Sequence, residues 1–138
     1  MRNTLRLLTI LLGLTGASFG HTGLPQVVAT RQRLNQTGPI SMDTLWVPLQ
    51  PGIYRVTIVM VVTVGGQQNS DWEPTISWVD ERGEEIYQFA VSQQSSSSSS
   101  VTVTIRDLPN SPIKGGVLSN GDNSGSKYDV FVVVEQIM

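Results

Sequence analysis

Four acidic side chains lie within six residues in the middle of the sequence, at Asp80, Glu81, Glu84 and Glu85. Two carboxyls held at a defined separation in a desolvated cleft are what glycoside hydrolysis needs. Residues 80–83, Asp-Glu-Arg-Gly, are however typical of a hairpin turn, and neighbouring strand residues such as Glu84 and Glu85 point to opposite faces of a sheet. We therefore expect a solvated turn, with a carboxylate-dependent glycan hydrolase as a minor alternative.

His21 is the single histidine, and it would become the N-terminus if a leader were cleaved after Gly20. Copper monooxygenases that act on polysaccharides bind their metal through such a terminal histidine and a second histidine, which this chain lacks. Histidine-rich zinc sites are excluded for the same reason. The chain has no cysteine, so thiolate metal sites and thiol catalysis are excluded as well. We expect a protein that is not an enzyme and has no resident cofactor.

Asp122 lies in a loop, Asn120-x-Asp122-x-Ser124-Gly125, that resembles the first half of a calcium loop. The twelfth position holds Phe131 where an EF-hand has glutamate, and no helical pattern flanks the loop, so an EF-hand is excluded. An irregular calcium site built from Asp122 and nearby carbonyl oxygens stays open as an alternative.

Trp72 is the one large apolar residue in residues 65–73, a polar stretch that we expect to be a loop. An exposed aromatic ring can stack on a sugar or contact a protein. Trp72 and Asp122 are therefore the candidate ligand-binding residues, for an extracellular protein or a glycan. Trp78 alternates with Ile76 and is expected in the core.

Residues 1–20 have the features of a signal peptide. Arg2 and Arg6 precede a short apolar run at 7–14, and small residues suited to cleavage follow. The apolar run is shorter than the ~18–20 residues that span a bilayer. We expect residues 21–138 to form one domain without a membrane span, which is secreted to the cell exterior, the cell surface or the periplasm.

The charge and cysteine content limit the possible partners. The nine basic residues of the chain include two in the leader, so seven remain against eleven acidic ones, a formal net charge near −4. This balance argues against nucleic acid, which needs a clustered basic face, and against anionic lipid. Because no disulfide can form, stability must come from the core and from subunit burial.

Apolar and polar residues alternate in about eight runs at roughly ten-residue spacing, with no helical period. The longest run follows the Pro51-Gly52 turn and ends at Val64, and the last covers residues 127–137. We expect the serines at 95–100 to form a loop and Gly115-Gly116 to break a weak strand at 113–119. The pattern predicts an all-β antiparallel sandwich, a jelly roll of about 8–10 strands.

Two of these runs are apolar on both faces near their centres. Val59 and Val61 lie opposite the core-facing residues of the long run, and Phe131 and Val133 do so in the last run. The outward face of an antiparallel sandwich is normally solvated. We therefore expect these four residues to lie at an oligomer interface or under another element.

Four motifs follow one another between Val27 and Ile137: Thr44-Leu45-x-Val47-Pro48, Pro51-Gly52-x-Tyr54-Arg55-Val56, Ile76-x-Trp78-x-Asp80 with Gly83, and Tyr128-Asp129-Val130-Phe131-Val132-Val133-Val134-Glu135. Together they resemble a bacterial and phage branch of the jelly-roll superfamily that includes tumour necrosis factor and the globular heads of complement first-component recognition subunits. The resemblance implies a compact homotrimer whose inner sheets face the threefold axis. It also implies binding or display, not catalysis.

The sequence therefore favours a secreted, non-enzymatic β-sandwich module that forms a homotrimer and binds or displays through its loops. A structural surface appendage or a virion-decoration protein, in which assembly is itself the function, is the alternative.

Overall fold

The computed structural model describes residues 24–67, 69–93 and 97–137. The expected signal peptide, residues 1–20, and His21 lie outside these ranges. Within them the chain forms nine strands and no helix. The strands are β1 (Gln26–Gln36), β2 (Ile40–Trp46), β3 (Gly52–Val64), β4 (Asp71–Asp80), β5 (Gly83–Gln88), β6 (Val91–Ser92), β7 (Ser98–Asp107), β8 (Ile113–Asn120) and β9 (Lys127–Gln136).

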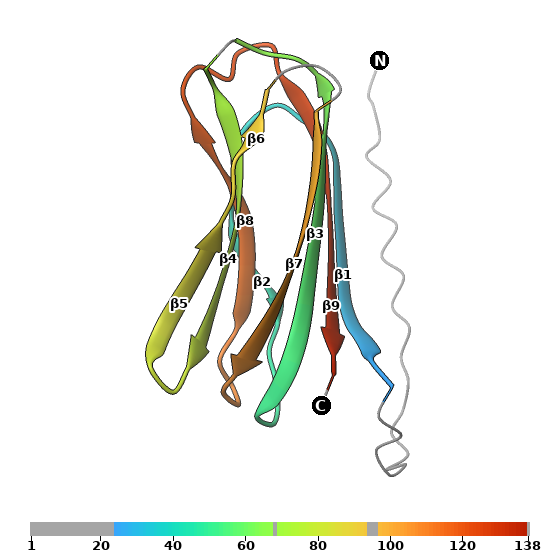
Figure 1. Cartoon of the computed structure of the whole chain (residues 1–138), viewed down its shortest axis with the longest axis vertical. Coiled ribbons are helices and arrows are strands. Elements are labelled where there is room, and N and C mark those ends of the chain that lie inside the picture. The colour runs from blue at the N-terminus through green and yellow to red at the C-terminus, as the bar shows by residue number, and fades with distance from the viewer. Residues whose placement is uncertain (1–23, 68, 94–96, 138) are drawn as a thin grey trace, which may run out of the picture.

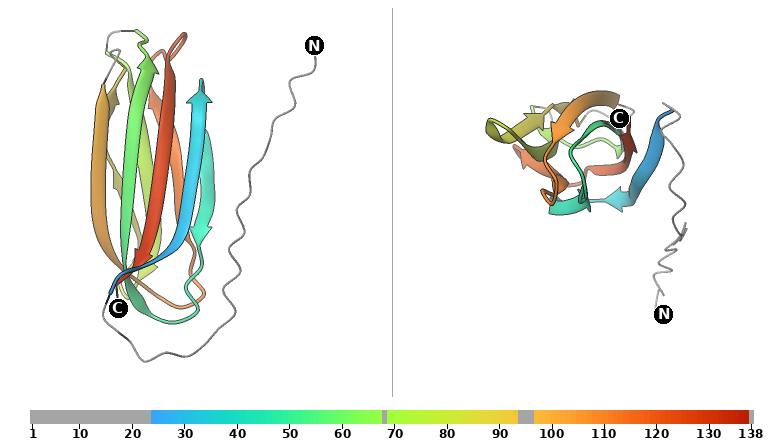
Figure 2. Two further views of the ribbon diagram at one scale, coloured as in Figure 1. Left: turned by 90° about the vertical axis from the view of Figure 1, so that its right-hand side faces the viewer. Right: turned by 90° about the horizontal axis from the view of Figure 1, so that it is seen from below.

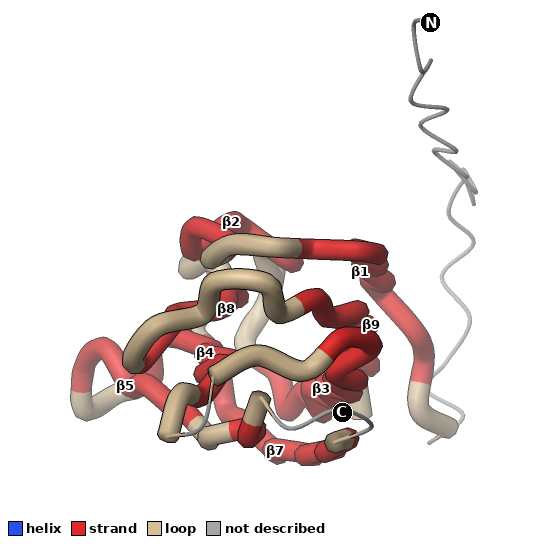
Figure 3. The backbone as a smooth tube through the Cα atoms, turned by 90° about the horizontal axis from the view of Figure 1, so that it is seen from above, coloured by secondary structure: helices blue, strands red, loops and turns tan. Residues whose placement is uncertain are grey.

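The strands form two antiparallel sheets that pack face to face (Figures 1 and 3). The first sheet has the order β1-β9-β3-β7, and the second has the order β2-β8-β4-β5 with the short β6 paired to β4. The pairs β1–β9, β2–β8, β3–β7 and β4–β5 are those of one long hairpin rolled into a sandwich. This is the jelly-roll arrangement, and it confirms the predicted all-β antiparallel sandwich.

The core lies between the sheets and follows the period of two along each strand. In β3 and β9, every second side chain is buried while its neighbours are only partly covered. Burying one such Val, Ile or Met side chain stabilises the fold by about 1.5–3 kcal/mol. The core residues from these two strands are Tyr54, Val56, Ile58, Met60, Val62, Tyr128, Val130, Val132 and Val134.

The turn between β4 and β5 is the predicted hairpin. Gly83 has a φ of 123°, a conformation that residues with a Cβ rarely adopt. The return strand β5 is short: it ends at Gln88, and residues 91–92 form the separate β6. β6 pairs with Asp71 and Trp72 at the other end of β4.

Two local predictions are wrong. Ser98, Ser99 and Ser100 belong to β7, so the serine run is not a loop throughout; Ser95 and Ser96 lie outside the described residues. These serines pair with residues 59–61 of β3, and the backbone hydrogen bonds of a ladder do not depend on the side chain. The Gly115-Gly116 pair does not break β8 either, because both glycines pair with β4 within an unshifted register.

The first sheet leaves its outer face uncovered. Figure 2 shows β7, β3, β9 and β1 side by side, and apart from the start of β1, which crosses the lower end of the sheet, no described element lies in front of them. This face carries the outward side chains of β3 and β9, among them the apolar residues that the sequence places opposite the core.

Candidate assembly surface and ligand sites

Val59, Val61, Phe131 and Val133 form one apolar cluster on the outer face of the first sheet. Val59 lies directly opposite Phe131, and the neighbouring pair across β3 and β9 joins Thr57 to Val133. All four apolar side chains are partly exposed. The antiparallel pairing of β3 with β9 thus brings together residues that are about 70 positions apart in the sequence.

Uncharged polar side chains border the apolar cluster on both sides. On β7, Ser100 lies opposite Val59, and on β1, Gln32 lies opposite Phe131. The next row continues from Thr102 through Thr57 and Val133 to Thr30. The Thr57 and Thr102 hydroxyl oxygens are 3.1 Å apart. The two central rows of this face therefore carry no charge.

The charged residues at the ends of the cluster are already paired within the same chain. Arg55 Nε donates to Glu135 Oε2 over 2.7 Å, and this hydrogen bond lowers the pKa of Glu135. At the opposite end, Asp129 Oδ1 accepts a 2.7 Å hydrogen bond from the backbone N–H of Asn35. Arg55 and Glu135 therefore neutralise each other, whereas Asp129, which lies opposite Val61, is bonded to a backbone N–H and has no cationic partner.

The outer face of the second sheet has a different composition. Its outward positions include Glu73, Glu84 and Lys114, together with the exposed apolar residues Ile86 and Leu118 and the buried Thr75 and Ser77. Such a mixture of charged and other side chains is common on a solvated sheet face. The apolar side chains of this face lie among charges, whereas the two central rows of the first sheet carry none.

Trp72 does not lie in an exposed loop, and that prediction is wrong. It belongs to β4 and is 0% exposed. Its ring lies 4.6 Å from that of Tyr128, and its Nε1 donates to Ser126 Oγ over 2.9 Å. The polar residues before Trp72 suggested a loop, but β6 and β8 pair with β4 as far as Asp71 and carry the strand through Trp72. A buried indole cannot stack on a ligand.

Asp122 is exposed in the loop between β8 and β9, as its sequence suggested. Its Oδ1 accepts a 2.9 Å hydrogen bond from the Ser124 N–H, and this contact lowers the pKa of Asp122. The hydrogen bond closes a local turn of the kind that Asp side chains form. Among the described residues there is no group of three or more His, Cys, Asp or Glu side chains that could hold a metal ion.

Three of the four acidic side chains at the hairpin between β4 and β5 form ion pairs with arginines. Arg82 contacts Asp80 at 3.0 Å and Glu85 at 3.4 Å, and Arg106 contacts Glu81 at 3.4 Å. Hydrogen bonds from Arg82, chiefly from its backbone N–H, lower the pKa of Asp80. A general acid needs the opposite shift, so the geometry gives the hydrolase alternative no support.

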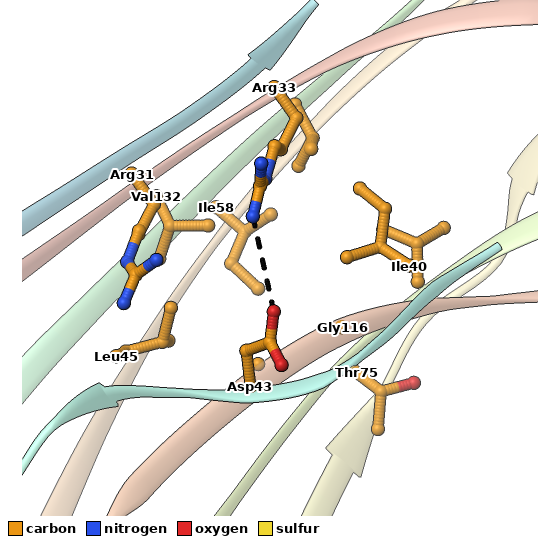
Figure 4. A pocket seen from close by; sticks show the side chains of 12 residues that line it. Arg31, Arg33, Ile40, Asp43, Leu45, Ile58, Thr75, Gly116 and Val132 are labelled. Carbon is orange, nitrogen blue, oxygen red and sulfur yellow. Dashed lines mark ion pairs between the residues drawn. The ribbon is translucent and has the colours of Figure 1, made fainter. Parts of the chain in front are cut away.

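A small cavity of about 40 Å³ opens between β1 and β2, at the side of the sandwich (Figure 4). Its walls are mainly apolar, and the charged side chains at its rim connect the two sheets: Arg33 lies 4.0 Å from Asp43, and Arg31 Nη2 donates to the Thr44 carbonyl over 2.8 Å. The volume corresponds to about three water molecules. The cavity is therefore a small gap at the side of the sandwich, and the two arginines line it.

Asp107, at the end of β7, is a buried carboxylate that sequence reasoning missed. It is 0% exposed, and its Oδ1 accepts hydrogen bonds from the N–H groups of Val79, at 3.3 Å, and Leu108, at 3.0 Å. Burial raises the pKa of Asp107, and the two hydrogen bonds oppose the rise. The alternation of Val101, Val103 and Ile105 places residue 107 on the inner face and could have revealed its burial.

No protein-family model matches this chain, and no curated protein has significant similarity to it. A jelly roll by itself serves many unrelated functions. In the described residues no helix has the length and apolar character needed to cross a membrane. The function must therefore be argued from the surfaces of this molecule.

Proposed function

We propose that the protein is a secreted, non-enzymatic β-sandwich module that self-associates as a homotrimer through the outer face of its first sheet. The loops at the ends of the sandwich, including the exposed loop around Asp122, would then be displayed to an extracellular protein or a glycan. The observation that carries the proposal is the apolar cluster of Val59, Val61, Phe131 and Val133 on an uncovered sheet face.

The chemistry of this face favours a second copy of the chain as its partner. Its central rows are apolar or hydroxylic, and Arg55 and Glu135 neutralise each other within one chain. Two or three copies can therefore pack these central rows together without bringing like charges into contact. A partner of strong charge would find no complementary charge there.

Two properties of the sequence favour self-association as well. The motifs that resemble the tumour necrosis factor-like jelly rolls imply a trimer whose inner sheets face the threefold axis, and the first sheet, which carries the apolar cluster, would take this place. The chain also contains no cysteine. Burial of an apolar surface between subunits is a means of stabilising a secreted domain that lacks disulfides.

Light scattering during gel filtration of the purified protein tests the proposal. We expect the wild type to form trimers, alone or within larger species. We expect Phe131→Lys to prevent trimer formation, because it would bury a charge at the interface. The matched control is Ile86→Lys, which changes an isoleucine that is 64% exposed on the outer face of the second sheet. A wild type that stays monomeric at high concentration would overturn the proposal, as would a Phe131→Lys protein that remains trimeric.

A further inference from the structure

Each of the two sheets has two edge strands, and three of these four edges are protected against pairing with another chain. Irregular pairing, charge and short length are the usual means of protection. The register of β1 with β9 shifts twice, and so does that of β2 with β8. Arg31 and Arg33 of β1 also reach across to β2, at Thr44 and Asp43. β5 has six residues and carries Glu84 and Glu85.

Apart from Arg106 and Asp107 at its end, β7 has none of these protections. It is ten residues long and pairs with β3 from Asp107 to Ser98 without a register shift. From Ser98 to Ile105 it contains no charged residue, no proline and no glycine. Its second edge pairs with no strand in the described part of the chain. A long, regular, uncharged edge is a template on which another strand can form.

The sequence of β7 is also suited to pairing with a copy of itself. Val101, Val103 and Ile105 face inward, while the hydroxyl side chains of Ser100, Thr102 and Thr104 face outward. Antiparallel pairing about a twofold axis keeps the two faces of the sheet apart, so hydroxyl groups meet hydroxyl groups and aliphatic side chains meet aliphatic side chains. No like charges would be brought together.

We propose that β7 is a second self-association site, at which two copies of the chain pair edge to edge in an antiparallel manner. The first sheets of the two copies would then join into one continuous sheet. Its strand order would be β1-β9-β3-β7 in one copy, followed by β7-β3-β9-β1 in the other. This contact uses the backbone edge of β7 and not the apolar cluster, which lies on β3 and β9.

The consequence concerns the kind of assembly that the protein forms. A subunit with one closed, symmetric contact stops at a small oligomer, whereas a subunit with two different self-contacts can link these oligomers into an extended array. Edge pairing of trimers would produce such an array. It favours the structural alternative, a surface appendage or decoration protein, in which assembly is itself the function.

The test places a charge on the edge of β7, at the exposed Thr104, which lies opposite Arg55 and outside the two central rows of the apolar face. Thr104→Lys and Thr104→Glu should each lose the species larger than the trimer, because like charges meet across the twofold axis. An equimolar mixture of the two variants should regain it. The control is Ile86→Lys, which puts the same charge on β5, an edge strand of the second sheet. It should assemble as the wild type does. Circular dichroism checks that all variants are folded.

Two outcomes would overturn the inference: a wild type that forms neither a species beyond the trimer nor a dimer that Thr104→Lys dissociates, or Thr104 variants that assemble as the wild type does. The two proposals fail separately. Phe131→Lys should leave a pair joined through β7, Thr104→Lys should leave a trimer, and the double variant should be monomeric. A wild-type dimer that Thr104→Lys dissociates and Phe131→Lys does not would remove the apolar-face contact and retain the edge contact.

The lack of cysteine offers a second measurement. Single cysteines at Ser100, Thr102 and Thr104 can form a disulfide only between two chains. In an antiparallel pair, the cysteine nearest the twofold axis should crosslink fastest, while Ile86→Cys should not crosslink. Equal crosslinking rates at all four positions would contradict a defined β7 contact.

Discussion

Trp72 shows how one residue changes its meaning when its neighbours are known. Its polar flanks suggest an exposed loop, yet its indole is packed against Tyr128 and bonded to Ser126 in the core. Asp107 is the reverse case, because an acidic residue in an apolar strand is easily taken for a surface residue and is wholly buried here. Substitution of either residue should therefore change the stability of the fold.

Trp72→Ala should destabilise the fold by about 3–5 kcal/mol, because it removes a fully buried aromatic ring and leaves a cavity. Leu49→Ala is the control, since Leu49 is 80% exposed and its truncation should change the stability by no more than about 0.5 kcal/mol. Urea denaturation measures both values. Equal and small effects would mean that Trp72 is an exposed contact residue after all.

Asp107→Asn should change how stability depends on pH. Burial raises the pKa of Asp107 in the folded state, so the wild type loses stability as pH rises from the unfolded value of about 3.9 through the folded pKa. Asparagine keeps the oxygen that accepts from Val79 and Leu108 but does not ionise. The variant should therefore be more stable than the wild type at pH 7, and this difference should shrink toward pH 3.

Urea unfolding of both proteins between pH 3 and pH 7 measures this difference. The comparison with the wild type cancels the other carboxyls, such as Glu135, whose lowered pKa makes stability fall at low pH. A variant that is less stable at pH 7 and equal to the wild type at pH 3 would show that the folded protein favours the ionised Asp107.

At the scale of elements, the contact between β2 and β8 depends on two glycines. A Cβ on Gly116 would lie 2.7 Å from the backbone oxygen of Ile40, whereas a Cβ on Gly115 would meet the end of the flexible Leu45 side chain at 2.8 Å. β2 can approach β8 in this register because residue 116 has no side chain. The glycines that suggested a broken strand are in fact what allows it to be paired on both sides.

Gly116→Ala should therefore destabilise the protein by about 1–3 kcal/mol, since β2 must move away. Alanine would otherwise be favoured over glycine within a strand by about 0.5–1 kcal/mol. Gly115→Ala should cost less, because the Leu45 side chain can rotate. Thermal or urea unfolding of the two variants gives the order, and a Gly115→Ala variant that is the less stable of the two would contradict it.

At the scale of the whole molecule, self-association should be visible in stability. Because only folded chains assemble, the melting temperature of the wild type should rise with protein concentration. Phe131→Lys and Thr104→Lys together should abolish this rise. Differential scanning fluorimetry over a hundredfold range of concentration measures it. A wild-type melting temperature that does not change over this range would contradict both proposed contacts.

The sequence by itself determined the class of fold and most of its strands. Alternation with a period of two places Tyr54, Val56 and Ile58 in the core and leaves Val59 and Val61 outside, whatever the neighbouring strands are. It also shows that the last strand is apolar at the centre of its second face, at Phe131 and Val133. These signals are local, so a single strand is enough to reveal them.

Tertiary structure decided what these faces meet. Only the pairing of β3 with β9 joins Val59 to Phe131, and only the pairing of β4 with β6 and β8 takes Trp72 out of a loop and into the core. The same holds for β7, whose sequence cannot say whether it lies in the middle of a sheet or at an edge. Strand partners come from distant parts of the chain, and backbone hydrogen bonds carry no side-chain signature. The alternation along each strand is therefore set by the sequence, whereas the surfaces that strands build together are set by the fold.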